Sequence, residues 1–279
     1  MTTTLRPTGP LQQTADGGKS RSYEVCVNSR SVGALDISTD AAFGHAAGIL
    51  QGLRVEEPDR RRGRGTVAVL AAEEVLRDWG CDQVLASAAP GETAALRLLD
   101  SLGYTERSRN MDKELGPEPP ALPEGVEGRP MSGAEYATWL AGAVDDFARV
   151  WTDRGTPPEA ARAKSERSHR ENLPDGLDTP GVTFSVLAHE GGAVGHVWVS
   201  RREVGPGRWE SYVYDVAVTE EMRGRGFGRA LMLLAERVAH ASGSDLLSLH
   251  VFTDNTPAVR LYESLRYRTV RRNYFKRLL

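Results

Sequence analysis

The sequence contains an internal repeat. The glycine-rich stretch Arg60–Gly65 recurs as Arg223–Gly228, 163 positions later, and Ala95–Tyr104 recurs as Ala258–Tyr267 at the same offset. The two segments align without a gap from residue 55 to residue 115 and share far more identical residues than chance provides. Because a repeat of this length encodes one folding unit twice, we expect two copies of one fold.

A proline-rich segment, 116–125, lies between the copies, with prolines at positions 117, 119, 120 and 123. Such a run favours an extended, semi-rigid linker. We therefore expect a first domain over 22–115 and a second over 126–279. The polar residues 1–21 are expected to form a disordered tail. The first copy is the shorter one and lacks the front part of the second.

The composition is that of an ordinary soluble protein. Hydrophobic residues make up 40% of the 279 positions and charged residues 26%, which excludes a disordered chain, a coiled coil and a collagen-like fibre. No apolar run approaches the roughly 18–20 residues that span a bilayer, and residues 1–22 lack the apolar core of a signal peptide. We expect a cytoplasmic protein with no membrane partner.

Net charge and cysteine content further limit the binding partners, the cellular compartment and the metal sites that we expect. The net charge of −3 argues against a dedicated nucleic-acid binder. Cys26 and Cys81 are too few for a disulfide framework and fit a reducing compartment. Neither has histidines or carboxylates at metal-ligand spacing, so both are expected to be buried apolar residues, and no metal is expected.

The second copy has the more complete pattern of elements. Two capping-box signals, Ser132–Glu135 and Thr156–Glu159, open two helices that together reach about Asn172. Strands are expected at 182–189, 193–200, 212–218, 246–252 and 268–278, and further helices at 226–241 and 257–265. This order, α-α-β-β-β-α-β-α-β, predicts a layered α/β domain.

A basic, glycine-rich loop follows the strand 212–218. Its glycines let the backbone approach a ligand closely, and the helix after it begins with unpaired amides at a positive dipole end. Arg223, Arg225 and Arg229 add positive charge that suits phosphates. The loop has neither the ending of a Walker loop nor the spacing of a dinucleotide fingerprint. From these residues alone, a phosphate site and an arginine-rich turn that only solvates a helix end both remain open.

Two signatures, in order, resemble the GCN5-related N-acetyltransferase (GNAT) superfamily. The first, [Arg/Gln]-x-x-Gly-x-[Gly/Ala] after the fourth strand, is met by Arg223, Gly226 and Gly228. The second is a strand, an asparagine and a helix with Leu-Tyr-Glu-x-Leu-Gly-Phe/Tyr, met by the strand 246–252, Asn255 and Leu261–Tyr267. One residue departs from this pattern, since Arg266 stands where the family usually has glycine. The resemblance covers the second copy and, more weakly, the first. It implies two α/β domains, each with a mixed, mostly antiparallel central sheet flanked by helices, the first domain being incomplete.

The resemblance implies acetyl-CoA as a co-substrate. In the family, loop amides bind the pyrophosphate, and the preceding strand bulges and splays from its neighbour, which frees amides for the pantetheine arm. The cofactor-binding residues implied in this way are Val216, Ala217, Val218, Arg223, Gly224, Arg225, Gly226, Phe227, Gly228, Arg229 and Asn255. Asn255 also stands at a helix-capping position, and the two roles can coexist.

The resemblance also implies direct attack of a primary amine on the thioester. Tyr262 matches the family's tyrosine that protonates the departing thiolate, although it could instead be an aromatic residue on the core face of a short helix. Two candidates remain for the base that deprotonates the amine, His250 and Asp215. Either could be structural, and many relatives use a water chain instead.

The first copy serves as an internal control. It retains the loop but carries other residues wherever chemistry is expected: Leu99 for Tyr262, Glu92 for Asn255, Ser87 for His250 and Gly52 for Asp215. Its hairpin, expected at 23–27 and 32–37, follows no counterpart of the two leading helices. We expect a catalytically inactive copy that could still bind CoA or pack as half of a pseudo-dimer, in a monomer or a homodimer.

The leading hypothesis is an acetyl-CoA-dependent N-acetyltransferase with one active site, in the second copy. The competing hypothesis is a non-catalytic CoA-binding sensor or interaction module. A mycothiol synthase-like acetyltransferase is a minority alternative, because no residue identifies that substrate. The acceptor would be set by the helices 133–172 and the loop 201–211, which carry no readable motif. Core or pocket-wall positions are expected for Trp139, Trp151, Trp198 and Trp209, and a solvated position for His169.

Overall fold

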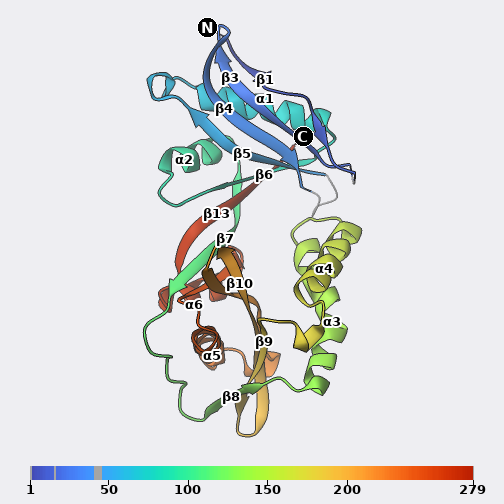
Figure 1. The fold of residues 1–279 in the computed structure, drawn as a ribbon, viewed down its shortest axis with the longest axis vertical. Coiled ribbons are helices and arrows are strands. Elements are labelled where there is room, and N and C mark those ends of the chain that lie inside the picture. The colour runs from blue at the N-terminus through green and yellow to red at the C-terminus, as the bar shows by residue number, and fades with distance from the viewer. Residues whose placement is uncertain (1, 16, 41–45, 279) are drawn as a thin grey trace. The chain divides into compact units, whose positions relative to one another are not determined.

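The structure is a computed structural model that describes residues 2–15, 17–40 and 46–278. It divides into two compact units, which Figure 1 shows as ribbons. The first unit comprises Met1–Ser108 together with Arg271–Leu279, and the second comprises Arg109–Val270. Each unit contains a glycine-rich loop followed by a helix, as the repeat predicts.

The first unit is a sheet on which helix α1 packs. Its strands lie in the order β1-β3-β4-β5-β6-β13, with β2 paired to β3; only β5 and β6 run parallel among the described pairs. Ala68, Val69, Ala72 and Leu76 of α1 form the core with the strands. The bounds are β1 Thr3–Pro7, β2 Gln12–Gln13, β3 Lys19–Val27, β4 Arg30–Thr39, β5 Ala47–Val55, η2 Glu57–Asp59, α1 Arg64–Asp78, β6 Gln83–Ala88 and α2 Thr93–Ser101.

The expected disordered tail is instead part of this sheet. β1 pairs antiparallel with β3, from Thr3↔Val27 to Pro7↔Tyr23. Leu5 packs on the core of the unit. The polar composition pointed to disorder, but a short strand needs only an occasional apolar side chain once a sheet edge offers it backbone partners. No helix precedes β3 among the described residues of this unit, so the leading helices of the second copy have no counterpart there.

The second unit has the expected sequence of elements. Its strands lie in the order β7-β12-β11-β10-β9-β8; β11 and β12 run parallel, and the pairs among β8, β9, β10 and β11 are antiparallel. The expected loop 201–211 is largely the far end of the β10–β11 hairpin. The bounds are β8 Val126–Pro130, α3 Gly133–Thr152, α4 Pro158–Asn172, η3 Gly176–Asp178, β9 Val182–His189, β10 Gly192–Gly205, β11 Arg208–Val218, η4 Glu220–Met222, α5 Phe227–Ala241, β12 Leu246–Phe252 and α6 Thr256–Ser264.

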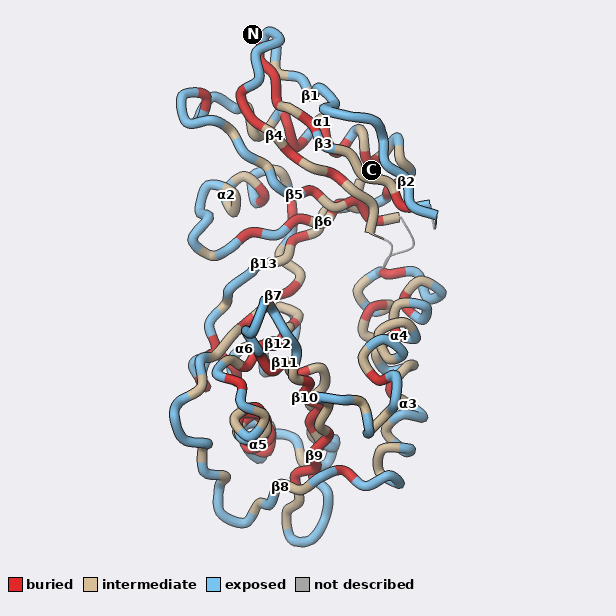
Figure 2. The backbone as a smooth tube through the Cα atoms, viewed as in Figure 1, coloured by how far each residue is buried: buried red, intermediate tan, exposed pale blue. Residues whose placement is uncertain are grey.

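Helices pack on both faces of this second sheet. Val197 and Val199 of β10 belong to the core under α5, whereas Trp198 between them packs with Trp139 of α3. This alternation follows from the pleat of a strand, which turns successive side chains to opposite faces. Figure 2 shows buried backbone positions along β9, β10 and α5. One face of the sheet is therefore the α5 face and the other the α3–α4 face.

The closing strands of the two copies are exchanged between the units. β7 (Thr105–Glu114) ends the first copy, yet its residues from Arg109 onward belong to the second unit. β13 (Arg268–Arg277) ends the second copy, yet from Arg271 onward it belongs to the first unit, where it pairs with β6. The sequence expectation of domains over 22–115 and 126–279 therefore differs from the compact units at both of these strands.

The repeat places equivalent lysines on the two closing strands and equivalent glutamates on helices α1 and α5. Lys276 Nζ lies 2.8 Å from Glu73 Oε2 in the first unit, and Lys113 Nζ lies 2.6 Å from Glu236 Oε1 in the second. Both lysines and both glutamates are related by the repeat offset of 163. Each closing strand therefore offers an equivalent ammonium group to an equivalent buried carboxylate.

The proline-rich segment 116–125 packs within the second unit. The carbonyl of Pro117 accepts a hydrogen bond from His240 Nε2 at 2.9 Å, and that of Pro120 accepts one from Arg237 at 3.3 Å. Leu122 packs on the core under α5. Contacts along α5 therefore hold this segment in place.

Candidate active site

The two central strands of the second unit separate along their length. β11 and β12 pair only from Ser211↔Leu247 to Val213↔Leu249. Next to this point β11 has a bulge at Tyr214, because Trp198 pairs with Asp215 while Val199 pairs with Val213. Beyond the bulge lies a cavity of about 160 Å³ whose lining includes Asp215, His250, Asn255 and Tyr262, together with Val213, Tyr214, Val216, Leu249, Val251 and Phe252. All three residues expected to do chemistry therefore meet in one cavity.

The glycine-rich loop begins helix α5 with open backbone. Gly224 and Gly226 have φ angles of 75° and 87°, in the left-handed region that favours glycine. A Cβ atom at either position would meet nothing within 4 Å, and no side chain caps the helix. The Arg229 amide donates to the Gly226 carbonyl at 3.0 Å, and the amides of Phe227 and Gly228 ahead of it are those that a helix start leaves without an intrahelical acceptor. The backbone at this end of α5 therefore provides the anion-binding geometry that the sequence predicts.

The side chains of the loop have different surroundings. Arg223 Nε lies 3.4 Å from the carbonyl of Val218, and Arg229 donates to Ser264 Oγ at 2.6 Å. Phe227 is buried in the core, so only its backbone can face a ligand. A Cβ at Gly228 would lie 3.3 Å from Leu261 Cδ2. Glycine at 228 therefore allows close packing of α5 on α6, a role distinct from that of Gly226.

Tyr262 projects from α6 and lines the cavity with only 6% of its surface exposed. Burial, with the negative charge of Asp215, raises the pKa of Tyr262 to about 12. Its phenol is therefore neutral at physiological pH and able to donate a proton. Asn255 caps the same helix, where its Oδ1 accepts from the amide of Ala258 at 3.3 Å, and it also lines the cavity.

Asp215 lies on the α3–α4 face, because it pairs with Trp198 across the β10–β11 ladder. Its Oδ2 accepts hydrogen bonds from Trp139 Nε1 at 3.0 Å and forms a 2.9 Å hydrogen bond with His196 Nε2. Burial alone would raise the pKa of Asp215, but the hydrogen bonds and charge of His196, with the Trp139 hydrogen bond, hold it below the ordinary value. The group is therefore an oriented carboxylate anion in the cavity wall.

The sequence predicts neither His196 nor Trp139 as a catalytic or cofactor-binding residue, and it predicts Trp139 only as a core or pocket-wall residue. A signal for His196 was present: β10 and β11 form a hairpin, and pairing outward from its turn places residue 196 beside residue 217, on the face that carries Asp215. Trp139 had no comparable signal, since the approach of α3 to the sheet is a tertiary contact. His250, a predicted candidate base, lines the cavity from β12, edge-on to Phe252.

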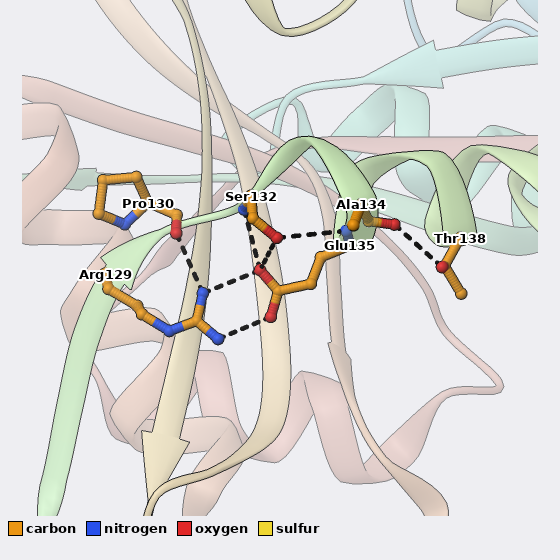
Figure 3. Close-up of polar contacts among 6 residues, drawn as sticks. All are labelled: Arg129, Pro130, Ser132, Ala134, Glu135 and Thr138. Carbon is orange, nitrogen blue, oxygen red and sulfur yellow. Dashed lines mark hydrogen bonds and ion pairs between the residues drawn. The ribbon is translucent and has the colours of Figure 1, made fainter.

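A network at the start of α3 fixes the helix that carries Trp139 (Figure 3). Glu135 Oε2 accepts hydrogen bonds from the Ser132 amide at 2.9 Å and from Arg129 at 2.9 Å, while Ser132 Oγ accepts from the Glu135 amide at 3.3 Å. This is the predicted capping box, reinforced by an ion pair. The Arg129 hydrogen bonds and those of Ser132 hold the pKa of Glu135 far below its usual value. Trp139 follows one helical turn later.

The positions of the remaining tryptophans and of His169 agree only in part with those expected from the sequence. Trp198 stacks between Phe184 and Tyr214, with ring centroids 5.2 and 4.7 Å away. Trp209 is 42% exposed, so the expectation of a core or pocket position is wrong there. His169 is not solvated: it is half-buried, with its ring 5.9 Å from that of Trp139 and Nδ1 2.8 Å from the Ser165 carbonyl. Because α4 is rich in charged residues, its sequence did not indicate that one of its faces packs inward.

Comparison with known proteins identifies the family. Residues 5–104 and 144–267 each match the acetyltransferase (GNAT) family. This chain belongs to the GNAT acetyltransferase family.

Similar proteins extend over most of this GNAT chain. The mycothiol acetyltransferase of Nocardiopsis dassonvillei is 30% identical over 278 residues, covering 90% of this chain and 79% of the relative. An uncharacterized N-acetyltransferase of Bacillus subtilis, YycN, is 32% identical over 136 residues, covering 48% of this chain and 86% of the relative.

Among solved structures, a GCN5-related N-acetyltransferase from Sphaerobacter thermophilus superposes with a TM-score of 0.60 at 22% identity, covering 92% of this chain and 80% of the other. A tandem GNAT protein from the clavulanic acid biosynthesis pathway gives 0.52 at 18% identity, with 93% and 83% covered. At these identities the likeness shows a shared fold, and the chain is a tandem GNAT protein.

The first GNAT copy keeps the scaffold and lacks the polar groups of the second. Gly63 begins α1 with a φ angle of 72°, and Arg60 Nε donates to the Val55 carbonyl at 2.8 Å, as Arg223 approaches that of Val218. Gly52, in the position of Asp215, also stands at a bulge. Leu99, in the position of Tyr262, is buried in the core. Arg61 replaces Gly224 and keeps a positive φ of 58°.

Among the described residues, no group of three or more histidine, cysteine, aspartate or glutamate side chains could hold a metal ion. The helices of the described chain also include none with the length and hydropathy needed to cross a bilayer.

Proposed function

We propose that this protein transfers the acetyl group of acetyl-CoA to a primary amine, by direct attack in a ternary complex at the second unit. The observation that carries this proposal is the single cavity between the separated strands β11 and β12. Tyr262, Asp215, His250 and Asn255 all line it. An acid on one side and an anionic or basic group on the other are what direct aminolysis of a thioester requires.

Acetyl-CoA would lie along the α5 side of this cavity. The backbone of Gly224–Arg229 would hold the pyrophosphate, because it combines open glycines with the amides at a helix N-terminus. The edge of β11 over Val216, Ala217 and Val218 would hold the pantetheine arm. The ladder between β11 and β12 ends at Val213, so this stretch of the β11 edge lies beyond it. Asn255 lines the cavity at the start of α6 and would contact the same arm.

The acceptor would enter from the α3–α4 face, where Asp215 carries its negative charge. A primary amine reaches an enzyme mainly as an ammonium ion, which a carboxylate attracts. The ammonium group must lose a proton before it attacks, and Asp215 and His250 are the cavity residues able to assist. Tyr262 would then protonate the thiolate of CoA as the tetrahedral intermediate collapses.

One assay separates this proposal from a non-catalytic CoA-binding module. The full-length protein is incubated with acetyl-CoA and a panel of amino acids, amino sugars, polyamines and peptides, and CoA is quantified by chromatography. The panel includes the unacetylated precursor of mycothiol, because relatives at about 30% identity bear the name mycothiol acetyltransferase. We expect amine-dependent release of CoA with at least one class. Binding of acetyl-CoA without such release from any amine would support the binding module.

A further inference from the structure

We infer that Arg154 sets the distance between the two walls of the cavity and is in this way a positioning residue for acetyl transfer. This inference rests on the proposed function. One wall carries Asp215 on β11, and the other carries Asn255 and Tyr262, which follow β12. The ladder between the two strands ends at Val213, so the pairing of β11 with β12 does not hold the walls together where the cavity lies.

Helix α3 contacts both walls. In its N-terminal half, Trp139 Nε1 donates to Asp215 Oδ2 on β11 at 3.0 Å. Two residues past its last residue, Thr152, Arg154 Nη2 donates to Asp254 Oδ1 at 2.8 Å, in the turn between β12 and α6. Because an α-helix is hydrogen-bonded along its whole length, these two contacts stand at a fixed separation. The helix therefore links the walls at the level where the sheet does not.

Arg154 makes three contacts at once, which an ordinary surface ion pair does not. Its Nη1 donates to the Val150 carbonyl at the end of α3 at 2.6 Å, and its guanidinium carbon lies 3.9 Å from the ring centroid of Phe252. The carboxylate of Asp254 is 60% exposed, so the ion pair alone contributes little. The planar, forked guanidinium suits simultaneous stacking and hydrogen bonding. Together the three contacts fix its plane.

The groups that Arg154 contacts lead directly into the cavity. Phe252 is the last residue of β12 and lines the cavity. Its carbonyl accepts a hydrogen bond from the Asn255 amide at 3.1 Å. Asn255 in turn caps α6 through the amide of Ala258, and Tyr262 follows on the same helix. A shift of this turn would therefore move the amide that lines the cavity and the phenol together.

Phe252 is held from α3 as well as from its own strand. Its ring lies edge-on to that of Trp151, with centroids 5.2 Å apart, and to that of His250, with centroids 5.0 Å apart. Trp151 is a buried residue of α3, whereas His250 lines the cavity. Edge-to-face pairs favour one relative orientation. A change in the position of α3 would therefore reach the cavity wall through Phe252 as well as through Asp254.

The first copy lacks both side chains that Arg154 contacts in the turn. The repeat offset places Ala89 at the position of Phe252 and Gly91 at that of Asp254. This turn is instead closed from within, because the Ala89 amide donates to the side chain of residue 92, a glutamate, at 2.6 Å. Where no leading helix is found among the described residues, the groups that would receive Arg154 are absent as well.

The test compares Arg154→Gln with wild type in the full-length protein, using acetyl-CoA and the best amine of the panel. Glutamine is shorter and uncharged, so it cannot stack on Phe252 and bond Asp254 at once. We expect kcat to fall at least about 10-fold, because a misplacement of about 1 Å can cost about 100-fold in rate. Acetyl-CoA affinity in isothermal titration should be retained, since the loop before α5 is unchanged. Arg154→Lys restores the charge without the planar fork and should recover only part of the rate.

The matched control is Arg149→Gln. Arg149 lies on α3 and pairs with Asp146 at 3.2 Å, and their side chains are 67% and 69% exposed, so its loss should leave kcat unchanged. Hydrogen exchange gives a readout that needs no turnover. The amides of Asn255 and Ala258, bonded in the turn and at the helix cap, should exchange faster in Arg154→Gln and at the wild-type rate in Arg149→Gln.

The outcomes separate this inference from the proposed function. If wild type releases CoA and Arg154→Gln keeps the wild-type kcat, or Arg154→Lys recovers it fully, the inference is overturned. It is also overturned if exchange accelerates throughout the second unit and acetyl-CoA binding is lost, which would show general destabilisation. If wild type releases no CoA with any amine, the proposed function fails, whereas faster exchange confined to the turn would still show that Arg154 holds it.

Discussion

At the scale of single residues, the cavity holds a neutral phenol and a carboxylate anion whose pKa values are shifted in opposite directions. Tyr262 and Asp215 line one small cavity. Burial raises the pKa of Tyr262, while hydrogen bonds from His196 and Trp139 overcome burial and lower that of Asp215. Shifts in opposite directions in neighbouring groups are typical of acid and base assignments. Residue type already makes Tyr262 neutral and Asp215 anionic at neutral pH, and the surroundings reinforce both states.

Replacing Tyr262 with phenylalanine removes the proton donor while keeping the aromatic ring in the core. We expect kcat to fall about 100-fold or more with acetyl-CoA affinity unchanged in isothermal titration. Because the pKa of Tyr262 is raised to about 12, the phenol stays protonated throughout the usual assay range. Wild-type activity should therefore show no loss attributable to this group up to about pH 10. Turnover that survives in the phenylalanine variant would remove Tyr262 from the mechanism.

At the scale of elements, the start of α5 gives a direct comparison between the copies. Gly226 begins α5 and Gly63 begins α1, with φ angles of 87° and 72°, and neither helix has a side-chain cap. The backbone geometry is therefore shared. What differs is the preceding turn, where Arg61 stands in the position of Gly224.

Substituting alanine for Gly226 or for Gly63 should lower the stability of the protein by similar amounts but should affect acetyl-CoA binding differently. A left-handed residue with a Cβ costs about 1–2 kcal/mol, so Gly226→Ala and Gly63→Ala should lower the unfolding free energy alike. Only Gly226→Ala should weaken acetyl-CoA binding, because Arg61 places a side chain where the second loop has open space. Calorimetric titration should give one site per chain. A second site lost in Gly63→Ala would show that the first loop is occupied.

The elements themselves were largely predictable, because their signals are local. The capping box at Ser132, the hairpin 182–200 and the glycines before α5 are encoded within a few residues each. Asn255 and Tyr262, which fall in the second family signature, and Asp215, a candidate base on the strand before the loop, all line the cavity. His196 needed the hairpin register, and Trp139 needed the packing of α3, which is not a local property. The β1 strand was missed because its stability comes from its partner strand, while its own composition is polar.

At the scale of the whole molecule, the exchange of closing strands could not be predicted from the sequence. The repeat makes Lys113 and Lys276 equivalent, and likewise Glu73 and Glu236. A closing strand would place its lysine beside an equivalent buried glutamate whether it paired within its own copy or with the other copy. Because these charged groups are equivalent in both copies, they cannot decide which strand completes which sheet. That outcome depends on how the chain connects the elements, which no local sequence pattern indicates.

The exchange has a thermodynamic signature in double-mutant cycles. Glu73 is 1% exposed and receives Lys276 Nζ at 2.9 and 2.8 Å, as well as the Tyr104 hydroxyl at 2.9 Å. Removing the ammonium group leaves a buried carboxylate without its counter-charge, which costs about 3–5 kcal/mol. We therefore expect Lys276→Met to destabilise the first unit by that amount, and Glu73→Gln with Lys276→Met to cost much less than the sum of the single changes.

The matched control is the same cycle with the lysine of the other strand. In the exchanged fold, Glu73 couples to Lys276 and Glu236 couples to Lys113, whereas Glu73 with Lys113 should be additive. Hydrogen exchange at β6 and at α5 reports the two units separately, which is needed because a two-unit protein does not unfold in one step. Coupling of Glu73 to Lys113 would mean that each copy keeps its own closing strand. Coupling of Glu73 to Lys276 means that β13, the last strand of the chain, completes the sheet of the first unit.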